Sequence, residues 1–438
     1  MNEMKKFFTL MGALALCSAM NAETVKMLTF GLGQPGSDEP GMMGFGISAN
    51  GNYICGAIEN GMGYFIGDLS LEKFIFEITS DEEGAELRNV NDNGVAIGYN
   101  GPGVTYSIDG VETVLLTPEG YKYVLGEDLS NDGSVMVGSL VGTGYATSAA
   151  YSKDGGEWEN LPMPSAEELG TYANSNMSSA KYVSGDGKVI AGYVGSFGPA
   201  MLWVMNEEGE YVADALFARY LYSADADDDN HKFLSLSANA LSNNGKYLAL
   251  QGTIMGDDLF DTATVAAVYD IETKELKIYD EPQPVDMYGI GLNPTAIADD
   301  GTFIGVTGQA FWGSSGCFIM KAGETVAESM VEAFPAYGEI YQISDMMGWS
   351  AAMDISADGG VIIGYAYYCD DFDDDDSIPY YSTWVIDTRD PSAVNAVEAI
   401  NAVPQEIYSI DGRKLNGLQK GINIIRMSDG SIKKIMNR

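Results

Sequence analysis

The chain has little of the chemistry that most enzymes and nucleic-acid-binding proteins use. It has one histidine, four cysteines, and 23 lysines and arginines against 63 aspartates and glutamates, so its formal net charge is −40. A phosphate-binding face needs clustered Lys and Arg. This balance argues against nucleic acid and anionic lipid as partners, and it is typical of an acidic protein that is soluble in an extracellular setting.

The chain also has few residues for histidine-based catalysis, zinc binding or disulfide bonds. The one histidine, His231, follows an acidic segment, and no G-x-S-x-G motif or serine partner surrounds it. Beyond residue 22 the cysteines are Cys55, Cys317 and Cys369, and their spacing fits neither a zinc site nor a disulfide framework. Each lies beside apolar strand residues, which favours buried free thiols. We expect no cofactor and no enzyme site of these kinds.

A long apolar run occurs only at the start of the chain. Lys5-Lys6 precede the apolar segment Phe7 to Leu16, and Ala19 and Ala22 offer small residues for cleavage. Residues 1–22 are therefore predicted to be a signal peptide, and the run is too short to span a bilayer. The segment ending in Leu16-Cys17 resembles a lipobox apart from the bulky Leu16, so lipidation of Cys17 stays an alternative.

Glycine is abundant, at 53 residues, and much of it belongs to a repeat. Val183 to Tyr193 reads VSGDGKVIAGY, and related segments occur seven times. Asp-Gly and Asn-Gly pairs supply the positive φ of tight hairpin turns, and the Asx side chain can bond its own backbone two residues on. The apolar run that follows is short and β-branched, as in a strand. The turn glycines are Gly51, Gly94, Gly133, Gly187, Gly245, Gly301 and Gly359.

A glycine also closes several copies of the repeat, and a second hairpin follows each copy. The closing residue indicates close backbone approach or a strand end; examples are Gly56, Gly98, Gly138 and Gly192. In the sixth copy the second hairpin is expected to pair 317–320 with Glu324-Thr325-Val326. Two hairpins make four strands, and repeats of this length with four strands are propeller blades. The predicted fold is all-β, a seven-bladed β-propeller with a small C-terminal β module.

The seventh copy lacks a fourth strand. Thr383 to Ile386 gives its third strand, after which the chain turns into Asp390-Pro391-Ser392. The segment Thr24 to Phe30 precedes the first repeat and has strand character. We predict that it closes the ring by pairing into the last blade, which would leave no long exposed edge.

These repeats resemble a known group of extracellular proteins. The S-x-[DN]-G-x-apolar-apolar-x-G hairpin, the A-x-x-W strand and the acidic-Gly turn are similar to HAF-type repeats and, more loosely, to the propellers of TolB and WD-repeat proteins. The resemblance covers roughly residues 24–390 and implies a β-propeller. Such repeats serve many functions, so the likeness implies no activity.

Two acidic runs are candidates for cation binding. Asp225 to Asn230 reads DADDDN, and Asp370 to Asp376 reads DDFDDDD. Calcium takes six to eight oxygen ligands, although neither run has EF-hand spacing. Solvated loop charge is the competing interpretation. The candidate calcium ligands are Asp370, Asp371, Asp373, Asp374, Asp375 and Asp376.

Three longer insertions separate the repeats, at 164–177, 215–232 and 324–341. Loops of this length on a rigid scaffold commonly carry recognition. Aromatic residues there would contact sugar rings or a protein partner, or else pack between blades. Those on or near the insertions are Tyr220, Tyr222, Phe311, Trp312, Tyr337, Tyr341 and Trp349.

The composition changes after Arg389. Residues 391–404 read as a linker, and residues 405–438 alternate strands with Asp-Gly turns and are basic. The segments IYSIDGRK, KGINIIR and SDGSIKKI resemble the C-terminal sorting domain of the type IX secretion system of Bacteroidetes, although the segment is short. The resemblance implies passage through the outer membrane, to a secreted or outer-cell-surface location, by means of that secretion machinery.

The domain order is then a signal peptide (1–22), a propeller (23–390), a linker (391–404) and a sorting domain (405–438). The preferred function is a monomeric, non-catalytic propeller that binds a glycan or protein through its loop face. The alternative is a carbohydrate-active, glycan-cleaving enzyme with a carboxylate pair in the central funnel. Only Arg88, Arg219 and Arg389 lie in the propeller region, which argues against an arginine cluster for a substrate carboxylate.

Overall fold

Contacts between residues divide the chain into two units, of which the larger is Glu23–Thr388 and the smaller contains Arg389–Arg438. The computed structural model describes residues 24–28, 41–58, 62–71, 73–78, 84–144, 146–195, 198–221, 233–255, 262–281, 283, 291–307, 316–335, 337, 347–368, 380–389, 404–409, 413–415, 421–427 and 432–437.

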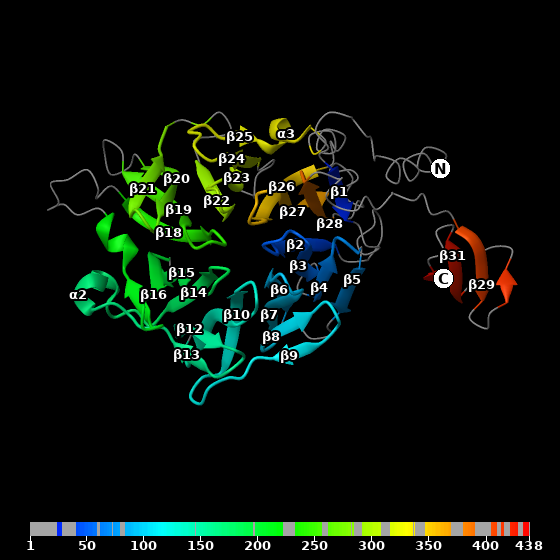
Figure 1. Ribbon diagram of the computed structural model, residues 1–438, viewed down its shortest axis with the longest axis horizontal. Helices are drawn as coiled ribbons and strands as arrows, with labels where there is room; N and C mark the ends of the chain where they lie inside the picture. Colours follow the sequence, from blue (N-terminus) through cyan, green and yellow to red (C-terminus); the bar gives the residue numbers. More distant parts are fainter. Residues whose placement is uncertain are drawn as a thin grey trace. The chain divides into compact units, whose positions relative to one another are not determined.

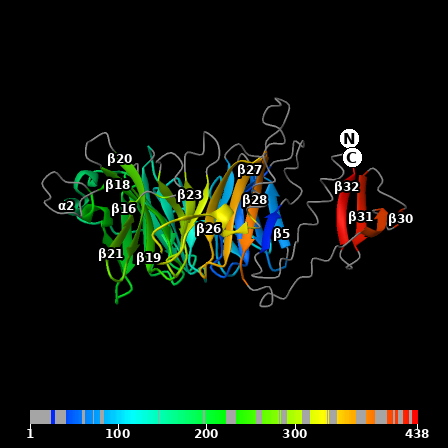
Figure 2. The same ribbon diagram turned by 90° about the horizontal axis from the view of Figure 1, so that it is seen from above.

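The larger unit is a ring of seven four-stranded antiparallel sheets, or blades (Figure 1). The first strand of each blade lies innermost, and the strands run from one face of the ring to the other (Figure 2). This confirms the predicted seven-bladed β-propeller. Blades 1 to 3 contain β2 (Met42–Ile47), β3 (Tyr53–Ile58), β4 (Gly63–Asp68), β5 (Lys73–Ile78); β6 (Ala85–Val90), β7 (Val95–Asn100), β8 (Gly103–Ser107), β9 (Glu112–Val114); and β10 (Tyr123–Leu129), β11 (Val135–Val141), β12 (Thr147–Lys153), β13 (Trp158–Asn160).

The remaining blades follow the same order, and short helices occur only in the connections that the structure describes. Blades 4 to 6 contain β14 (Ser178–Val183), β15 (Val189–Val194), β16 (Ala200–Met205), β17 (Tyr211–Asp214); β18 (Phe233–Leu241), β19 (Tyr247–Met255), β20 (Thr262–Asp270), β21 (Glu275–Tyr279); and β22 (Leu292–Ile297), β23 (Phe303–Thr307), β24 (Cys317–Met320), β25 (Glu328–Ser329). The helical segments are α2 (Ala166–Leu169), η2 (Gly170–Tyr172), η3 (Leu216–Arg219) and α3 (Met330–Ala333).

Each repeated segment forms the turn between the first two strands of a blade. In blade 3 the buried Ser130 hydroxyl donates to Asp132 Oδ1 (2.9 Å) and accepts from the Val135 amide (2.9 Å). Asp132 Oδ1 also accepts from the Ser134 amide (2.9 Å), the Asx bond predicted from the sequence. All seven turn glycines have φ between 68° and 91°. The preceding Asx residue does not share this positive φ, so only the glycine supplies it.

The closing glycine marks a close approach between neighbouring strands. At Gly138 an added Cβ would lie 1.9 Å from the Leu125 carbonyl oxygen of the innermost strand. A side chain there is excluded without moving the backbone, which confirms the sequence-based interpretation. The same approach, at 2.0 to 2.2 Å, occurs at Gly56, Gly98, Gly192, Gly305 and Gly364, whereas blade 5 has Leu250 at this place.

The N-terminal strand closes the ring, as predicted. Blade 7 contains β26 (Met347–Ile355), β27 (Val361–Tyr368) and β28 (Tyr380–Asp387), and its fourth strand is β1 (Thr24–Leu28). β1 pairs antiparallel with β28, with Thr24 opposite Asp387 and Leu28 opposite Thr383. The first and last parts of the propeller are thereby held in one sheet.

One predicted strand is wrong in its position. In blade 6 the fourth strand was expected at 324–326, but it is β25, which pairs with β24 through Glu328 and Ser329. Residues 322–326 form the turn before it, and the Glu324 amide donates to the Lys321 carbonyl (3.1 Å). The sequence places a strand-like Thr-Val pair in this turn, and pairing with β24 decides the register.

The core lies between adjacent blades. Val137 from blade 3 and Trp203 from blade 4 are fully buried in one cluster, and corresponding clusters occur around the ring. Cys55 and Cys317 are buried free thiols, as predicted; Cys369 lies outside the described residues.

The smaller unit contains one four-stranded sheet in the order β30-β29-β31-β32. Its strands are β29 (Pro404–Ser409), β30 (Lys414–Leu415), β31 (Gly421–Met427) and β32 (Ile432–Asn437). They fall in the segments that the sequence assigns to strands, except that β29 begins at Pro404, the last residue of the predicted linker. β29 pairs with both β30 and β31. None of the helices in the described part of the chain has the length and apolar character needed to cross a bilayer.

Ring closure by β1 makes a testable prediction. Deletion of residues 23–28 would leave the edge of β28 unpaired, so we expect the melting temperature to fall by at least about 5 °C and the protein to self-associate. Differential scanning calorimetry and light scattering would measure both effects. A synthetic peptide of residues 23–30 is expected to restore the melting temperature, and deletion of residues 390–438 is the control. An unchanged melting temperature after the first deletion would contradict the closure role.

Candidate functional site

The innermost strands of all seven blades surround a central cavity of about 590 Å³. Each of these strands carries a bulge near its end, where the pairing with the second strand shifts by one residue. A bulge leaves one extra residue and re-aims its side chain. At the bulge that all seven strands share, the extra residues are Phe45, Arg88, Glu127, Lys181, Asn239, Thr295 and Met353, and all but Asn239 line the cavity. β18 and β26 each have a second bulge nearer their start.

The residue after the bulge braces one blade to the next. In blade 3, Asp128 accepts from the amides of Leu129 (2.7 Å) and of Val183 in blade 4 (2.7 Å), and from Asn89 Nδ2 in blade 2 (2.6 Å). In blade 7, Asp354 accepts from the amides of Ile355 (2.8 Å) and of Ile47 in blade 1 (2.8 Å). Both carboxyl groups thus act at equivalent positions of the ring.

Further polar side chains of the innermost strands bridge other blades. Asn239 in blade 5 donates to the Pro294 carbonyl in blade 6 (3.0 Å), and Thr295 in blade 6 donates to the Ala352 carbonyl in blade 7 (2.8 Å). Between blades 1 and 2 the strands lie so close that a Cβ on Gly46 would be 2.7 Å from the Arg88 carbonyl oxygen. Of the groups that bridge blades, Thr295, Asp128 and Asp354 also line the cavity.

Burial raises the pKa of both bracing carboxyl groups. Desolvation raises the pKa of Asp128 to about 8 and that of Asp354 to about 7, although the backbone amides that donate to them act in the opposite direction. The charge of Asp354 also raises the pKa of Asp128. These two groups consequently change charge near neutral pH while they hold adjacent blades together.

A chain of alternating charges lies along one part of the cavity wall. Lys181 Nζ is 2.6 Å from Glu127 Oε1, Arg88 Nη1 is 3.4 Å from Glu127 Oε2, and Arg88 Nη2 is 2.6 Å from Glu86 Oε1. Glu127 is nearly buried, with 7% of its side chain exposed, whereas 40% of the Arg88 side chain is exposed. Burial opposes the charge of Arg88, but Glu127 and Glu86 raise its pKa overall. The two cations and two carboxylates balance one another.

Aromatic rings accompany these charges. The Arg88 guanidinium lies 5.8 Å from the centre of the Tyr99 ring, and Lys181 Nζ lies 5.9 Å from that of Tyr193. Phe45 meets Tyr365 edge to face with the ring centres 5.9 Å apart. Each of these tyrosines directly follows a closing glycine, so the Gly-Tyr pairs of blades 2, 4 and 7 were the sequence signal for this site. None of these three tyrosines was predicted as a site residue.

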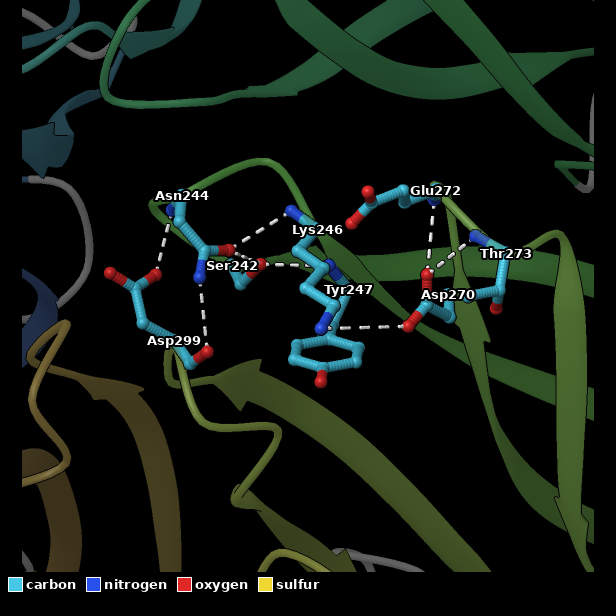
Figure 3. Close-up of polar contacts among 8 residues, drawn as sticks. All are labelled: Ser242, Asn244, Lys246, Tyr247, Asp270, Glu272, Thr273 and Asp299. Carbon is cyan, nitrogen blue, oxygen red and sulfur yellow. Dashed lines mark hydrogen bonds and ion pairs between the residues drawn. The ribbon is translucent and has the colours of Figure 1, made fainter.

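The repeat turns frame one end of the cavity and are joined in a ring. Between blades 5 and 6, the Asn244 amide donates to Asp299 Oδ1 (2.7 Å) and its side chain donates to the Asp299 carbonyl (3.0 Å), while Ser242 holds the turn from within (Figure 3). Hydrogen bonds join every adjacent pair of turns; the residues concerned are Ala49, Asn50, Asp92, Asn93, Asp132, Asn131, Gly185, Asn243, Asn244, Asp299 and Ala357.

The structure does not test the predicted calcium ligands. Asp370, Asp371 and Asp373 to Asp376 lie outside the described residues, as do His231 and the acidic run 225–230. Within the parts of the chain that the structure describes, no group of three or more His, Cys, Asp or Glu side chains could hold a metal ion.

The aromatic residues predicted for the loop face have a different role where they are described. Tyr337 is buried, and its hydroxyl lies 2.9 Å from Ser350 Oγ, which also accepts from Trp384 Nε1 (3.0 Å). Tyr220 packs edge to face on Tyr269, with ring centres 6.4 Å apart. Both tyrosines therefore pack between blades, which was the alternative interpretation of these aromatic residues. Outside the described residues or side chains lie Tyr222, Phe311, Trp312, Tyr341 and Trp349.

Neither a known family model nor a curated protein matches the sequence. Among solved structures, the chain is similar to TolB from Acinetobacter baumannii, with 13% identity and a TM-score of 0.40, over 64% of this chain and 63% of TolB, less than two thirds of its length. It is also similar to the β-propeller domain of the Trilobed protease from Pyrococcus furiosus, with 11% identity and a TM-score of 0.43, over 83% of this chain and 98% of that domain. A mutant puromycin hydrolase is similar with 10% identity and a TM-score of 0.48, over 91% of this chain and 61% of the hydrolase.

The bracing carboxyl groups predict an unusual dependence of stability on pH. A carboxyl whose pKa is raised on folding binds its proton more tightly in the folded state, so its contribution is complete below about pH 4 and is lost as the pH rises to about 8. We expect the free energy of unfolding of the wild type to contain this falling component. Denaturant titrations between these limits would measure it.

The substitution Asp128→Asn should remove the Asp128 part of this slope. It also presents an amide N–H₂ in place of an acceptor for the Val183 amide, at a cost of about 1–3 kcal/mol. Asp132→Asn is the control, because hydrogen bonds lower the pKa of Asp132 and its contribution is lost as the pH falls. An Asp128→Asn protein with the full wild-type slope would contradict the assignment.

Proposed function

We propose that this protein is a non-catalytic binding propeller that engages a glycan or protein partner at its central cavity and surrounding loop face. The carboxylates of the cavity carry this proposal. Each of the four carboxyl side chains that line the described part of the cavity has a structural partner: Asp128 and Asp354 brace blades, and Glu86 and Glu127 pair with cations. A general acid or nucleophile instead needs a carboxyl oxygen that is free to exchange a proton with the substrate or to attack it.

The loop face supports the same proposal. In each blade the repeat turn joins the first two strands at one end of the ring, so the connections between successive blades lie at the other end. The described connection 161–177 is rigidly held: Ser165 and Glu168 form a capping box at α2, Leu169 is buried, and Trp203 Nε1 donates to the Pro162 carbonyl (2.7 Å). Loops fixed on a rigid scaffold are suited to recognition.

The glycan-cleaving alternative has one observation in its favour. The raised pKa values of Asp128 and Asp354 are those that a glycosidase general acid needs near neutral pH. The same two groups are occupied by backbone amides of adjacent blades, which explains their positions without catalysis. We therefore propose binding as the function and keep glycan hydrolysis as the alternative.

Incubation with a panel of neutral and acidic oligosaccharides tests the two functions against each other. We expect binding on a glycan array without any release of reducing ends or shorter products, measured by mass spectrometry. Products that form with the wild type but not with folded Asp128→Asn or Asp354→Asn proteins would establish the enzyme alternative. Circular dichroism would verify that the variants are folded.

We also propose export to the outer cell surface or the medium. The supporting observations are the predicted signal peptide at 1–22 and the type IX-like segments of the tail, which contain the strands β29 to β32. Since propeller and tail form separate contact units, the tail is expected to act on its own.

A fusion of residues 1–22, a fluorescent protein and residues 391–438 tests this proposal in a Bacteroidetes host. We expect the fluorescence to reach the cell surface or medium, and to remain in the periplasm in a host without type IX machinery. The fusion that lacks residues 405–438 is the matched control. Equal export of both fusions would contradict a sorting role for the tail.

A further inference from the structure

We propose that the ligand of the central cavity is the end of a neutral glycan chain, bound at the part of the wall formed by blades 1 to 4. This inference rests on the proposed binding function and deepens it. The residues concerned, here called the charged wall, are Phe45, Glu86, Arg88, Glu127, Lys181 and Tyr193.

The charge balance of the charged wall selects against ionic ligands. Lys181 and Arg88 both contact Glu127, and Arg88 also contacts Glu86, so the two cations and two carboxylates are already matched. To pair with Arg88 or Lys181, an acidic ligand would have to separate that cation from Glu127. The Glu127 side chain is only 7% exposed, so breaking the ion pair would leave a nearly buried charge without its partner, which costs free energy. The net charge of −40 also repels an acidic ligand.

The same pairs leave hydrogen-bonding groups for hydroxyls. Arg has five N–H donors and Lys has three, and the side chains of Arg88 and Lys181 are 40% and 26% exposed. Their carboxylate partners hold them in fixed orientations, and hydrogen bonds to charged groups are stronger than those between neutral groups. A sugar hydroxyl both donates and accepts, so it can use donors and carboxylate oxygens of the wall together.

Apolar faces lie beside these polar groups. The Tyr193 ring lies next to Lys181 and lines the cavity, as does Phe45 from blade 1. An aromatic ring supplies a rigid, flat contact surface with little entropy to lose. Rings beside fixed donors and acceptors match a sugar, which presents C–H faces and hydroxyl edges.

The size of the cavity favours a chain end over a folded partner. Its volume of about 590 Å³ lies within the roughly 300–1,000 Å³ that small-ligand sites occupy. A folded protein cannot enter such a space, and a peptide end would bring the terminal charge that the charged wall does not accommodate. A neutral sugar residue is small enough for the cavity and brings no charge.

Isothermal titration calorimetry with the full-length protein tests the inference. The probes are neutral hexasaccharides of glucose, xylose and mannose, with hexagalacturonate and a short charged peptide as ionic comparisons. We expect a neutral probe to bind and the ionic probes not to bind. Because no ion pair forms with the ligand, the affinity should change less than about twofold between roughly 0.05 and 0.5 M salt.

Two matched pairs of variants locate the site. Arg88→Gln should weaken binding about tenfold or more, whereas Lys73→Gln should not: Lys73 also contacts a carboxylate, Asp109, and is 43% exposed, but it lies on the outer strand β5, outside the cavity. Lys181→Met should weaken binding likewise, whereas Lys277→Met should not, although Lys277 also lies over a tyrosine ring, that of Tyr279, at 4.6 Å. Thermal unfolding would verify each fold.

The outcomes separate this inference from the proposed function. Tight binding of hexagalacturonate or the peptide, or no binding of any neutral probe, would overturn the neutral-glycan inference. Neutral-glycan binding that Arg88→Gln and Lys181→Met leave unchanged would place the site elsewhere on the propeller, again overturning the inference while the binding function stands. Cleavage of a probe would instead overturn the proposed function.

Discussion

The close approach of two backbones, marked by a glycine in six of the seven blades, is the constraint from which the cavity follows. Where the innermost strand bulges, its carbonyl oxygen comes so near the second strand that an added Cβ at Gly138 would be 1.9 Å away. Glycine permits that approach, and the bulge turns one extra side chain toward the centre. Repetition around the ring converts a local irregularity into a cavity lined by Arg88, Glu127 and Lys181.

The polar interior is also structural. Asp128 and Asp354 occupy equivalent places and accept amides from their own and the following blade, so the innermost strands are joined by side chains as well as by packing. Burial raises the pKa of both groups. Considered alone, such raised pKa values would indicate catalytic residues. Burial at the narrow centre of the ring, where both groups brace adjacent blades, explains the same upward shifts without catalysis, and the hydrogen bonds to both groups act in the opposite direction.

A protein with a net charge of −40 has thus kept two of its few cations at its centre and matched them with carboxylates. The repulsion among surface acids contributes to solubility, while the interior charges are held in fixed pairs. These four groups together present donors and acceptors without a net charge. This separation of surface charge from interior polarity is the basis for inferring a neutral ligand.

Much of the fold could be predicted from local signals. The turn glycines and Asx residues specify hairpins because positive φ and the Asx bond depend only on neighbouring atoms. Counting those turns gave seven blades, and the missing strand of the last blade indicated that Thr24–Leu28 pairs with β28. The position of β25 was wrong because pairing with β24, and not the strand character of residues 324–326, decides its register.

The candidate site could be predicted far less well. Arg88, Glu127 and Lys181 are 39 and 54 residues apart in the sequence, and nothing local shows that they meet. The sequence by itself determined the repeated turns, their number and the acidic character, because each depends on composition or on adjacent residues. Only the tertiary structure decided which side chains face the cavity, since that depends on a bulge and on the circular arrangement of distant strands.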